Sequence, residues 1–338
     1  YIVVEDRIKK LYELGKELNW NVSSDLDWSQ DYPKDKLMIN YELFQTPESV
    51  LKGYDDLSDE KKVEMDRHRV SWNISQFLHG EQGALLVASQ LVSCAPTYQA
   101  KLYAASQCFD EARHVEVFNR YLQDVMGMSY QISPSLKALL DKGLTDPRWD
   151  LKFIAMQIII EGLALAAFQS TKMTTTCPLL RDLTHYVIRD EARHVTFGIN
   201  YLEEFNQTLS KDEIEDRARF AYEACVIMRD RIQNYELGKK FFGYTEQEAR
   251  EAILKSGVND DFRNLLFNRV MPNLKKIGLL TESVRPLYDE LGLLEYEVAP
   301  SDFEIDWAEI SKPLEASDEI ESQASAEAEI LKDIVQNH

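Results

Sequence analysis

The chain has 338 residues, 44% of them hydrophobic, which is enough to bury a sizeable core in one large domain. Its formal net charge of −20 argues against nucleic acid and membrane surfaces as partners. The four cysteines form no CxxC pair and no signal peptide is visible, so we expect a protein of the reducing cytoplasm.

Residues 1–57 are expected to form an N-terminal helix and a brace that packs on the rest of the chain. Apolar residues at helical spacing predict the helix near the start, and a loop with two tryptophans and two prolines follows. No pattern in this segment carries chemistry. The apolar helical positions are Ile8, Leu11, Tyr12, Leu14 and Leu18.

Residues 58–207 predict a run of helices that begin and end at recognisable signals. Ser58 and Ser133 are expected N-caps, Pro178 is expected to open the last helix, and Pro96 and Gly143 are expected to stop two others. The expected helices are 58–93, 97–125, 133–143, 146–171 and 178–206.

The stretch Phe153–Phe168 is apolar enough to suggest a membrane span. It is too short for one, and Gln157 and Glu161 interrupt it, so we expect a buried core helix.

Residues 208–299 predict additional helices packed on this bundle. Ser210 with Glu213, and Thr245 with Glu248, have the spacing of capping boxes. The expected helices are 211–240, 246–256 and 259–278, the last kinked or broken at Pro272.

Residues 300–338 differ in composition from the rest of the chain. From residue 301 onward, eleven acidic residues stand against two lysines. This composition is typical of a flexible, solvated acidic tail, with a docking segment for a partner as the alternative.

One hexapeptide, Asp-Glu-Ala-Arg-His-Val, occurs twice, at 110–115 and at 190–195. Thirty residues before the Glu of each copy stands another Glu inside an apolar helical run. The two halves are therefore one pattern repeated with an offset of eighty residues, which predicts a duplicated helix pair. The acids are Glu81 and Glu111 in the first repeat, and Glu161 and Glu191 in the second.

This pattern predicts a site for two metal ions. Glu and His three residues apart point from the same helix face, so Glu111 with His114, and Glu191 with His194, can each hold an ion. The upstream acids complete a set of four carboxylates and two imidazoles, which suits iron or manganese. An unpaired buried carboxylate costs several kcal/mol, so such a cluster requires cations. The alternative is a structural network of salt bridges.

The other charged residues of the hexapeptide are expected to support the ligands. Metal-bound His usually donates its second ring N–H to a carboxylate, and Asp110 and Asp190 are candidates for that role, each serving the His of the other repeat. Arg113 and Arg193 are expected to pair with those acids.

A substrate pocket is expected beside the metal ions, with mainly small or apolar walls that favour a hydrophobic or aromatic molecule. Gly198 mirrors Phe118 of the first repeat and leaves room there for substrate. The candidate pocket residues are Phe77, Ala84, Ala88, Ala104, Gln107, Cys108, Gln157, Ala164, Leu165 and Phe168.

The doubled motif with Glu81 and Glu161 resembles the ferritin-like di-iron carboxylate oxidases and oxygenases, over about residues 58–207. Ribonucleotide reductase small subunits, bacterial multicomponent monooxygenase hydroxylases and ligand-binding oxidases belong to this superfamily. The resemblance implies an all-α, ferritin-like four-helix bundle core with additional helices at both ends. It also implies that the two Glu-x-x-His pairs and the upstream acids are the metal ligands, and that Asp110 and Asp190 support them.

Several positions depart from particular branches of that superfamily. The reductases typically carry a radical tyrosine where this chain has Phe118, and commonly Asp where it has Glu81. The arylamine N-oxygenases add a third His where this chain has Val187, and the multicomponent hydroxylases often have Thr where it has Leu165. These departures leave the particular reaction open.

The leading hypothesis is an O2-activating di-iron oxygenase or oxidase that acts on a small, hydrophobic organic substrate by hydroxylation, N-oxygenation, desaturation or oxidative cleavage. An external electron donor, a ferredoxin or a reductase, is implied, and the family suggests a homodimer. One alternative is a reductase-like or ligand-binding oxidase with a manganese/iron site. The others are a ferroxidase or iron-handling protein, and a metal-free structural bundle.

Overall fold

The computed structural model describes residues 7–30, 32–43, 45–229 and 235–302. The described residues contain no β-strand, only an isolated bridge between Ile39 and Thr175. The prediction of an all-α protein is therefore confirmed. The helices are α1 Arg7–Glu17, α2 Asp59–Cys94, α3 Tyr98–Arg120, α4 Pro134–Thr145, α5 Trp149–Phe153, α6 Glu161–Thr174, α7 Pro178–Asn206, α8 Lys211–Arg229, α9 Glu236–Phe242, α10 Glu246–Ser256, α11 Asp260–Lys276 and α12 Arg285–Glu290.

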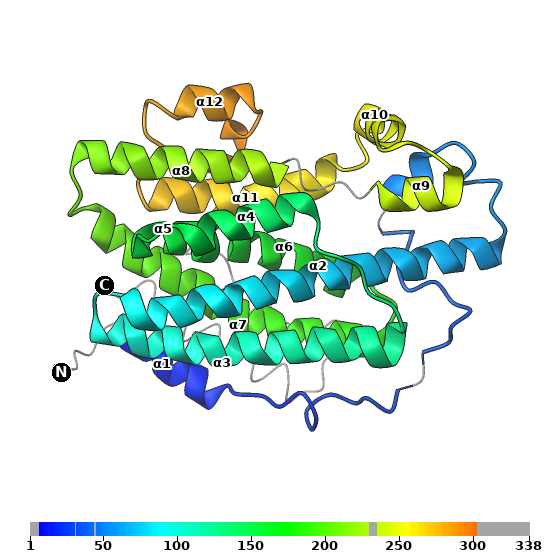
Figure 1. The fold of residues 1–338 in the computed structure, drawn as a ribbon, viewed down its shortest axis with the longest axis horizontal. Coiled ribbons are helices and arrows are strands. Elements are labelled where there is room, and N and C mark those ends of the chain that lie inside the picture. Colours follow the sequence, from blue (N-terminus) through cyan, green and yellow to red (C-terminus); the bar gives the residue numbers. More distant parts are fainter. Residues whose placement is uncertain (1–6, 31, 44, 230–234, 303–338) are drawn as a thin grey trace.

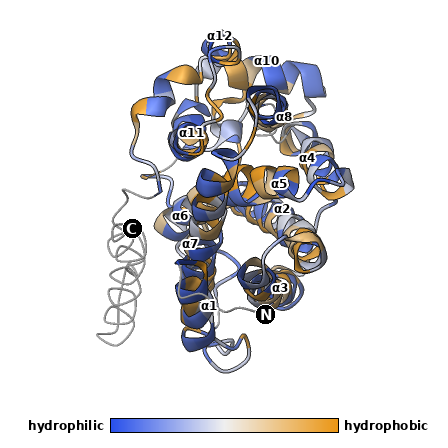
Figure 2. Ribbon diagram, turned by 90° about the vertical axis from the view of Figure 1, so that its left-hand side faces the viewer, coloured by the Kyte–Doolittle hydropathy of each residue, from blue (hydrophilic) through white to orange (hydrophobic). Residues whose placement is uncertain are grey.

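Helices α2, α3, α6 and α7 form the central bundle (Figure 1). Helices α2 and α3 pack along their length, as do α6 and α7, so each predicted repeat is one helix pair. Helix α1 lies against α3 and α7, while α11 packs on α6 from the other side. In Figure 2, hydrophobic residues are concentrated on α5 and α6 in the middle of the molecule. The helix that carries Glu161 is therefore surrounded by other helices.

Side-chain caps begin several helices at the residues that the sequence predicts. The Ser58 hydroxyl accepts from the backbone N–H of Lys61, and the Ser133 hydroxyl accepts from that of Leu136. Thr245 and Glu248 form a complete capping box at the start of α10. These local predictions are confirmed. They could be made from the sequence because each cap depends only on residues within one helical turn.

Two predicted helix ends are wrong, and a break, one of the two alternatives expected at Pro272, does not occur. Helix α4 continues past Gly143 to Thr145. The single helix expected over 211–240 is instead α8 and α9, with the non-helical Tyr235 before α9. Helix α11 runs through Pro272 without a break, because its apolar residues on both sides of the proline are buried against the bundle. Tertiary packing thus overrides the local stop signals.

The third helix of the bundle contains a π-helical segment, Ile154–Ile160, between α5 and α6. Together they form a continuous helix from Trp149 to Thr174, 26 residues long, so the expectation that it is too short to span a membrane is wrong. However, 89% of its most apolar window is buried inside the protein, as in the core helix of a bundle. A second π-helical segment, Tyr121–Met126, continues α3.

The described chain ends in a buried contact rather than at the surface. Asp302 accepts a hydrogen bond from Arg269 at 2.6 Å and another from Asn273, and is only 2% exposed. The rest of the expected acidic tail, residues 303–338, lies outside the described residues.

Gly198 in α7 is required by a close approach of the π-helical segment. A Cβ there would overlap the Cβ of Gln157, so the room that the sequence suggested for substrate is filled by this side chain. We expect Gly198→Ala to destabilise the protein in urea unfolding, because overpacking costs about 1–3 kcal/mol and better helix propensity returns at most about 1 kcal/mol. Gly80→Ala is the control, since a Cβ there meets nothing within 4 Å. Equal stability of the two variants would contradict the expected clash.

Candidate metal centre

The four acids and two histidines of the repeat meet in the interior of the bundle. Helix α2 carries Glu81, α3 carries Glu111 and His114, α6 begins with Glu161, and α7 carries Glu191 and His194. Glu81 is 4% exposed, Glu161 is 2% exposed and the other four are fully buried. Residues far apart in the sequence therefore form one dry polar cluster inside an apolar core.

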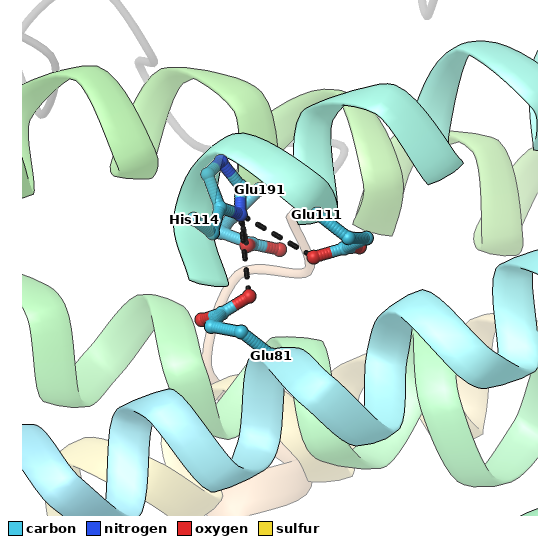
Figure 3. Close-up of side chains that lie close together, drawn as sticks. All are labelled: Glu81, Glu111, His114 and Glu191. Atoms are coloured by element: carbon cyan, nitrogen blue, oxygen red, sulfur yellow. Dashed lines mark hydrogen bonds and ion pairs between the residues drawn. The ribbon is translucent and has the colours of Figure 1, made fainter. Parts of the chain in front are cut away.

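The cluster consists of two overlapping groups, each with ligand atoms within 4.8 Å of one another. Glu111 and Glu191 belong to both groups. Glu81 and His114 complete the first group, which is shown in Figure 3, and Glu161 and His194 complete the second. Two neighbouring positions, each with carboxylate oxygens and one imidazole, therefore share two acids.

The imidazoles face several carboxylates at once. His114 Nδ1 lies 3.2 Å from Glu81, 3.3 Å from Glu111 and 3.1 Å from Glu191. His194 Nδ1 lies 3.1 Å from Glu191 and 3.2 Å from Glu111. A ring nitrogen carries at most one proton, so it cannot donate to all of these oxygens. A cation between them can satisfy all of them.

Within the cluster, two buried carboxylate oxygens form no hydrogen bond and lie 3.3 and 3.1 Å from the same ring nitrogen, His114 Nδ1. They are Glu111 Oε2 and Glu191 Oε1, which belong to the two shared acids. Buried polar atoms in proteins are nearly always paired. These oxygens, together with a set rich in oxygen ligands, fit a pair of iron or manganese ions.

Ionisation of the cluster is strongly perturbed when no cation is bound. Burial, together with the charge of Glu191, raises the pKa of Glu81 and of Glu161 well above its usual value. Burial alone would lower the pKa of His114, but hydrogen bonds with Asp190 and the glutamates outweigh it and raise that pKa. The cluster thus holds extra protons that divalent ions would displace.

The aspartate of each hexapeptide contacts the histidine of the other repeat. His114 Nε2 lies 3.1 Å from Asp190, and His194 Nε2 lies 3.2 Å from Asp110. Arg113 donates to Asp110 at 2.5 Å and to Asp190 at 2.9 Å, while Arg193 also pairs with both acids. This network leaves each Nδ1 facing the glutamates.

Trp20 contributes to this network, although no sequence pattern indicated it. Its indole N–H donates to Asp190 at 2.7 Å, across 170 positions of the chain. The Arg113 guanidinium lies 5.3 Å from the centre of the Trp20 ring. No local pattern could find this contact, because it depends on how the N-terminal segment packs against α3 and α7.

We expect Asp190→Asn to weaken metal binding, because the amide can no longer accept every N–H that now points at Asp190. Loss of such a supporting carboxylate typically lowers metal affinity by about 10–100-fold. Titration of the metal-free protein with Mn²⁺ would measure the change. Asp146→Asn, at a partly buried acid between α4 and α5 that pairs with Arg148, is the control, and equal affinities would contradict the expected role of Asp190.

A cavity of about 170 Å³ adjoins the cluster and reaches Glu81 and Glu161. Four of the expected pocket residues line it, namely Phe77, Ala84, Ala164 and Phe168. Its wall also includes Arg69, a buried arginine that donates to Glu48 at 2.6 Å and that the sequence did not single out.

The other six expected pocket residues do not line this cavity. Ala88, Ala104 and Leu165 are fully buried in helix packing. Gln107 and Gln157 are fully buried and form hydrogen bonds beside the cluster, and Cys108 is half-buried on α3. Position on the ligand-bearing helices alone does not decide which side chains face the cavity.

Comparison with known proteins gives one family and one set of related folds. The model of the p-aminobenzoate N-oxygenase AurF family matches residues 3–277. No curated protein matches the sequence. Among solved structures, R2-like ligand-binding oxidase variants with a Mn/Fe cofactor are similar, one at 21% identity and TM-score 0.51, another at 20% and 0.50. Each match covers 74% of this chain and 90% of the other, and at this identity shows the fold alone.

Proposed function

Because this chain belongs to the AurF family of p-aminobenzoate N-oxygenases, we propose that its buried cluster of glutamates and histidines holds the metal pair of an O2-dependent oxidoreductase. The protein is a di-iron or manganese/iron oxygenase or oxidase that uses O2 and a small-molecule substrate. When bound, such a metal pair supplies electrons to O2 and thereby the oxidising power of the reaction. The proposed ligands are Glu81, Glu111, His114, Glu161, Glu191 and His194.

The observation that carries this proposal is the overlap of the two ligand groups in a dry interior. Four buried carboxylates share one small volume, and two of their oxygens lack a hydrogen-bond donor. Removing several carboxylates from water without compensation is too costly for a domain of ordinary stability. Two divalent cations balance the four charges.

The remaining residues of the hexapeptides position the ligands. Asp110 and Asp190 accept from Nε2 of the histidines, which fixes each ring with Nδ1 toward the glutamates. Arg113 and Arg193 pair with both aspartates in their buried setting. Burial alone would raise the pKa of Asp190, but Arg193, His114 and Arg113 outweigh it and hold that pKa well below its usual value. These four residues thus prepare the site before any ion arrives.

We further propose that the substrate is hydrophobic or aromatic and binds in the cavity beside Glu81 and Glu161. The side chains of Phe77 and Phe168, packed edge to face with ring centres 4.7 Å apart, offer an aromatic, apolar wall. Val187 stands where the arylamine N-oxygenases carry a third histidine. N-oxygenation therefore stays one of four candidate reactions, with hydroxylation, desaturation and oxidative cleavage.

An external ferredoxin or reductase is proposed as the electron donor, and a homodimer in the cytoplasm as the working form. The proposed organisation is an N-terminal brace over 1–57, the metal bundle over 58–207, additional helices over 208–299 and an acidic segment over 300–338. The contact between Trp20 and Asp190 supports the assignment of the first segment as a brace.

The test is to load the metal-free protein anaerobically with Fe²⁺ and then expose it to O2. We expect about two ions per chain, followed by uptake of O2 and a change in the visible absorption spectrum. A protein that binds fewer than two ions, or binds two and never reacts with O2, would overturn the proposal. With excess Fe²⁺, growth of an iron mineral without oxidation of organic compounds would favour a ferroxidase instead.

A further inference from the structure

Two buried glutamines stand beside the candidate metal centre. Gln107 precedes Glu111 by one turn of α3, and Gln157 precedes Glu161 by four residues in the π-helical segment. Both are fully buried. The Gln107 amide donates to Glu111 at 3.0 Å and to Glu161 at 3.3 Å, while its carbonyl accepts from Gln157 at 3.1 Å. The two side chains therefore form a chain of hydrogen bonds that ends on two of the candidate ligands.

The hydrogen bonds run from Gln157 to Gln107 and on to the carboxylates. Gln107 presents its NH2 group to Glu111 and Glu161 and its carbonyl to Gln157. Carboxylates that bind a metal ion are deprotonated and can only accept hydrogen bonds, so metal binding keeps this direction. Gln157 Oε1 is then left buried, with no hydrogen-bond partner in the described part of the chain. An unsatisfied buried carbonyl lowers stability. Packing alone would be better served by an apolar residue, so Gln157 is explained by what it donates to.

The other repeat has no counterpart to these amides. At the offset of eighty residues, Val187 corresponds to Gln107 and Phe77 to Gln157. Phe77 packs against Phe118, with ring centres 5.7 Å apart, whereas the equivalent of Phe118 is Gly198, which gives Gln157 its space. The two positions that carry hydrogen-bonded glutamines in one half of the duplicated site therefore carry apolar side chains in the other half.

Of the two acids that receive these hydrogen bonds, Glu111 belongs to both groups, so the difference between the ion positions lies in the acids that the groups do not share. Glu161 belongs only to the group with His194, and Glu81 only to the group with His114. We propose that Gln107 and Gln157 are positioning residues that make the two ion positions unequal, by restraining Glu161 while Glu81 stays free to adjust beside the cavity. This inference rests on the proposed metal site.

The experiment is a calorimetric titration of the metal-free, full-length protein with Mn²⁺ under anaerobic conditions. Gln107→Met removes both amide donors at nearly constant volume. We expect it to weaken one of the two binding events by about 10–100-fold, the usual effect of losing a supporting hydrogen bond. The other event, which Gln107 reaches only through the shared Glu111, should weaken by much less. Gln157→Met keeps Gln107 in place and is expected to weaken the more sensitive event by less than Gln107→Met does.

Asn206→Leu is the matched control, because it also removes a buried amide, which donates to Ile277 at 2.8 Å far from the centre. Its two binding events should equal those of the wild type. Equal weakening of both events by Gln107→Met, or no change in either glutamine variant, would overturn the inference and leave the proposed function standing. A wild-type protein without two binding events would overturn both.

Discussion

Replacing Glu161 with glutamine is expected to abolish binding of the second ion while leaving the stability of the metal-free protein unchanged. Burial and the neighbouring Glu191 and Glu111 raise the pKa of Glu161 well above its usual value, so the metal-free fold favours the uncharged form of this acid. Glutamine has the same shape and the same lack of charge. The variant should therefore melt like the wild type without metal, yet lose much of the rise in Tm that Mn²⁺ or anaerobic Fe²⁺ produces.

The loss should exceed the 10–100-fold typical of supporting residues, because a direct ligand is removed. Reactivity of the Fe²⁺-loaded protein toward O2 should disappear with it. The control is Glu116→Gln, an exposed acid on α3. If Glu161→Gln binds two ions as tightly as the wild type, Glu161 is not a ligand. If its metal-free Tm falls sharply, the acid is charged in that state.

Filling the cavity is expected to lower turnover of the organic substrate while metal content and uptake of O2 are retained. Ala164 lines the cavity beside Glu161, one turn before Phe168. Ala164→Phe places an aromatic ring in the space proposed for substrate, and exclusion from a shaped pocket commonly costs about 100-fold in kcat/KM. Metal content and uptake of O2 should persist, because Ala164 contributes no ligand. The measurement is product formation from a panel of small aromatic compounds, including p-aminobenzoate and aniline.

Ala105→Phe makes the same change at an exposed position of α3 and should behave as the wild type. Undiminished turnover by Ala164→Phe would show that the substrate binds elsewhere. Loss of metal together with turnover would show that the variant perturbs the bundle rather than the cavity.

Much of the fold could be predicted because its signals are local or periodic. Ser58, Ser133 and Thr245 cap helices through bonds that reach only three residues along the chain. The eighty-residue repeat paired Glu81 with Glu161, and the structure brings both acids to one cluster. A repeated motif carries long-range information, because two copies of one helix pair can pack only in a few related ways.

The remaining features depend on contacts that no local pattern records. Gly143 indicated a helix end and Pro272 a kink or a break, yet packing carries one helix past Gly143 and the other through Pro272 without a break. Gln107 and Gln157 were expected in the pocket, because their helix faces were known but the π-helical segment was not. Trp20 was placed in a loop without chemistry, since only the packed structure brings its indole to Asp190.

The sharing of Glu111 and Glu191 also governs when the site can exist during protein synthesis. Each proposed ion position takes acids from both halves of the chain, so neither is complete until the segment with Glu191 has left the ribosome. A nascent chain that exposes only the first helix pair offers three of the six proposed ligands and neither complete position. Loading must therefore follow translation of both halves, and a gene split between the repeats would yield two fragments that each fail to retain an ion.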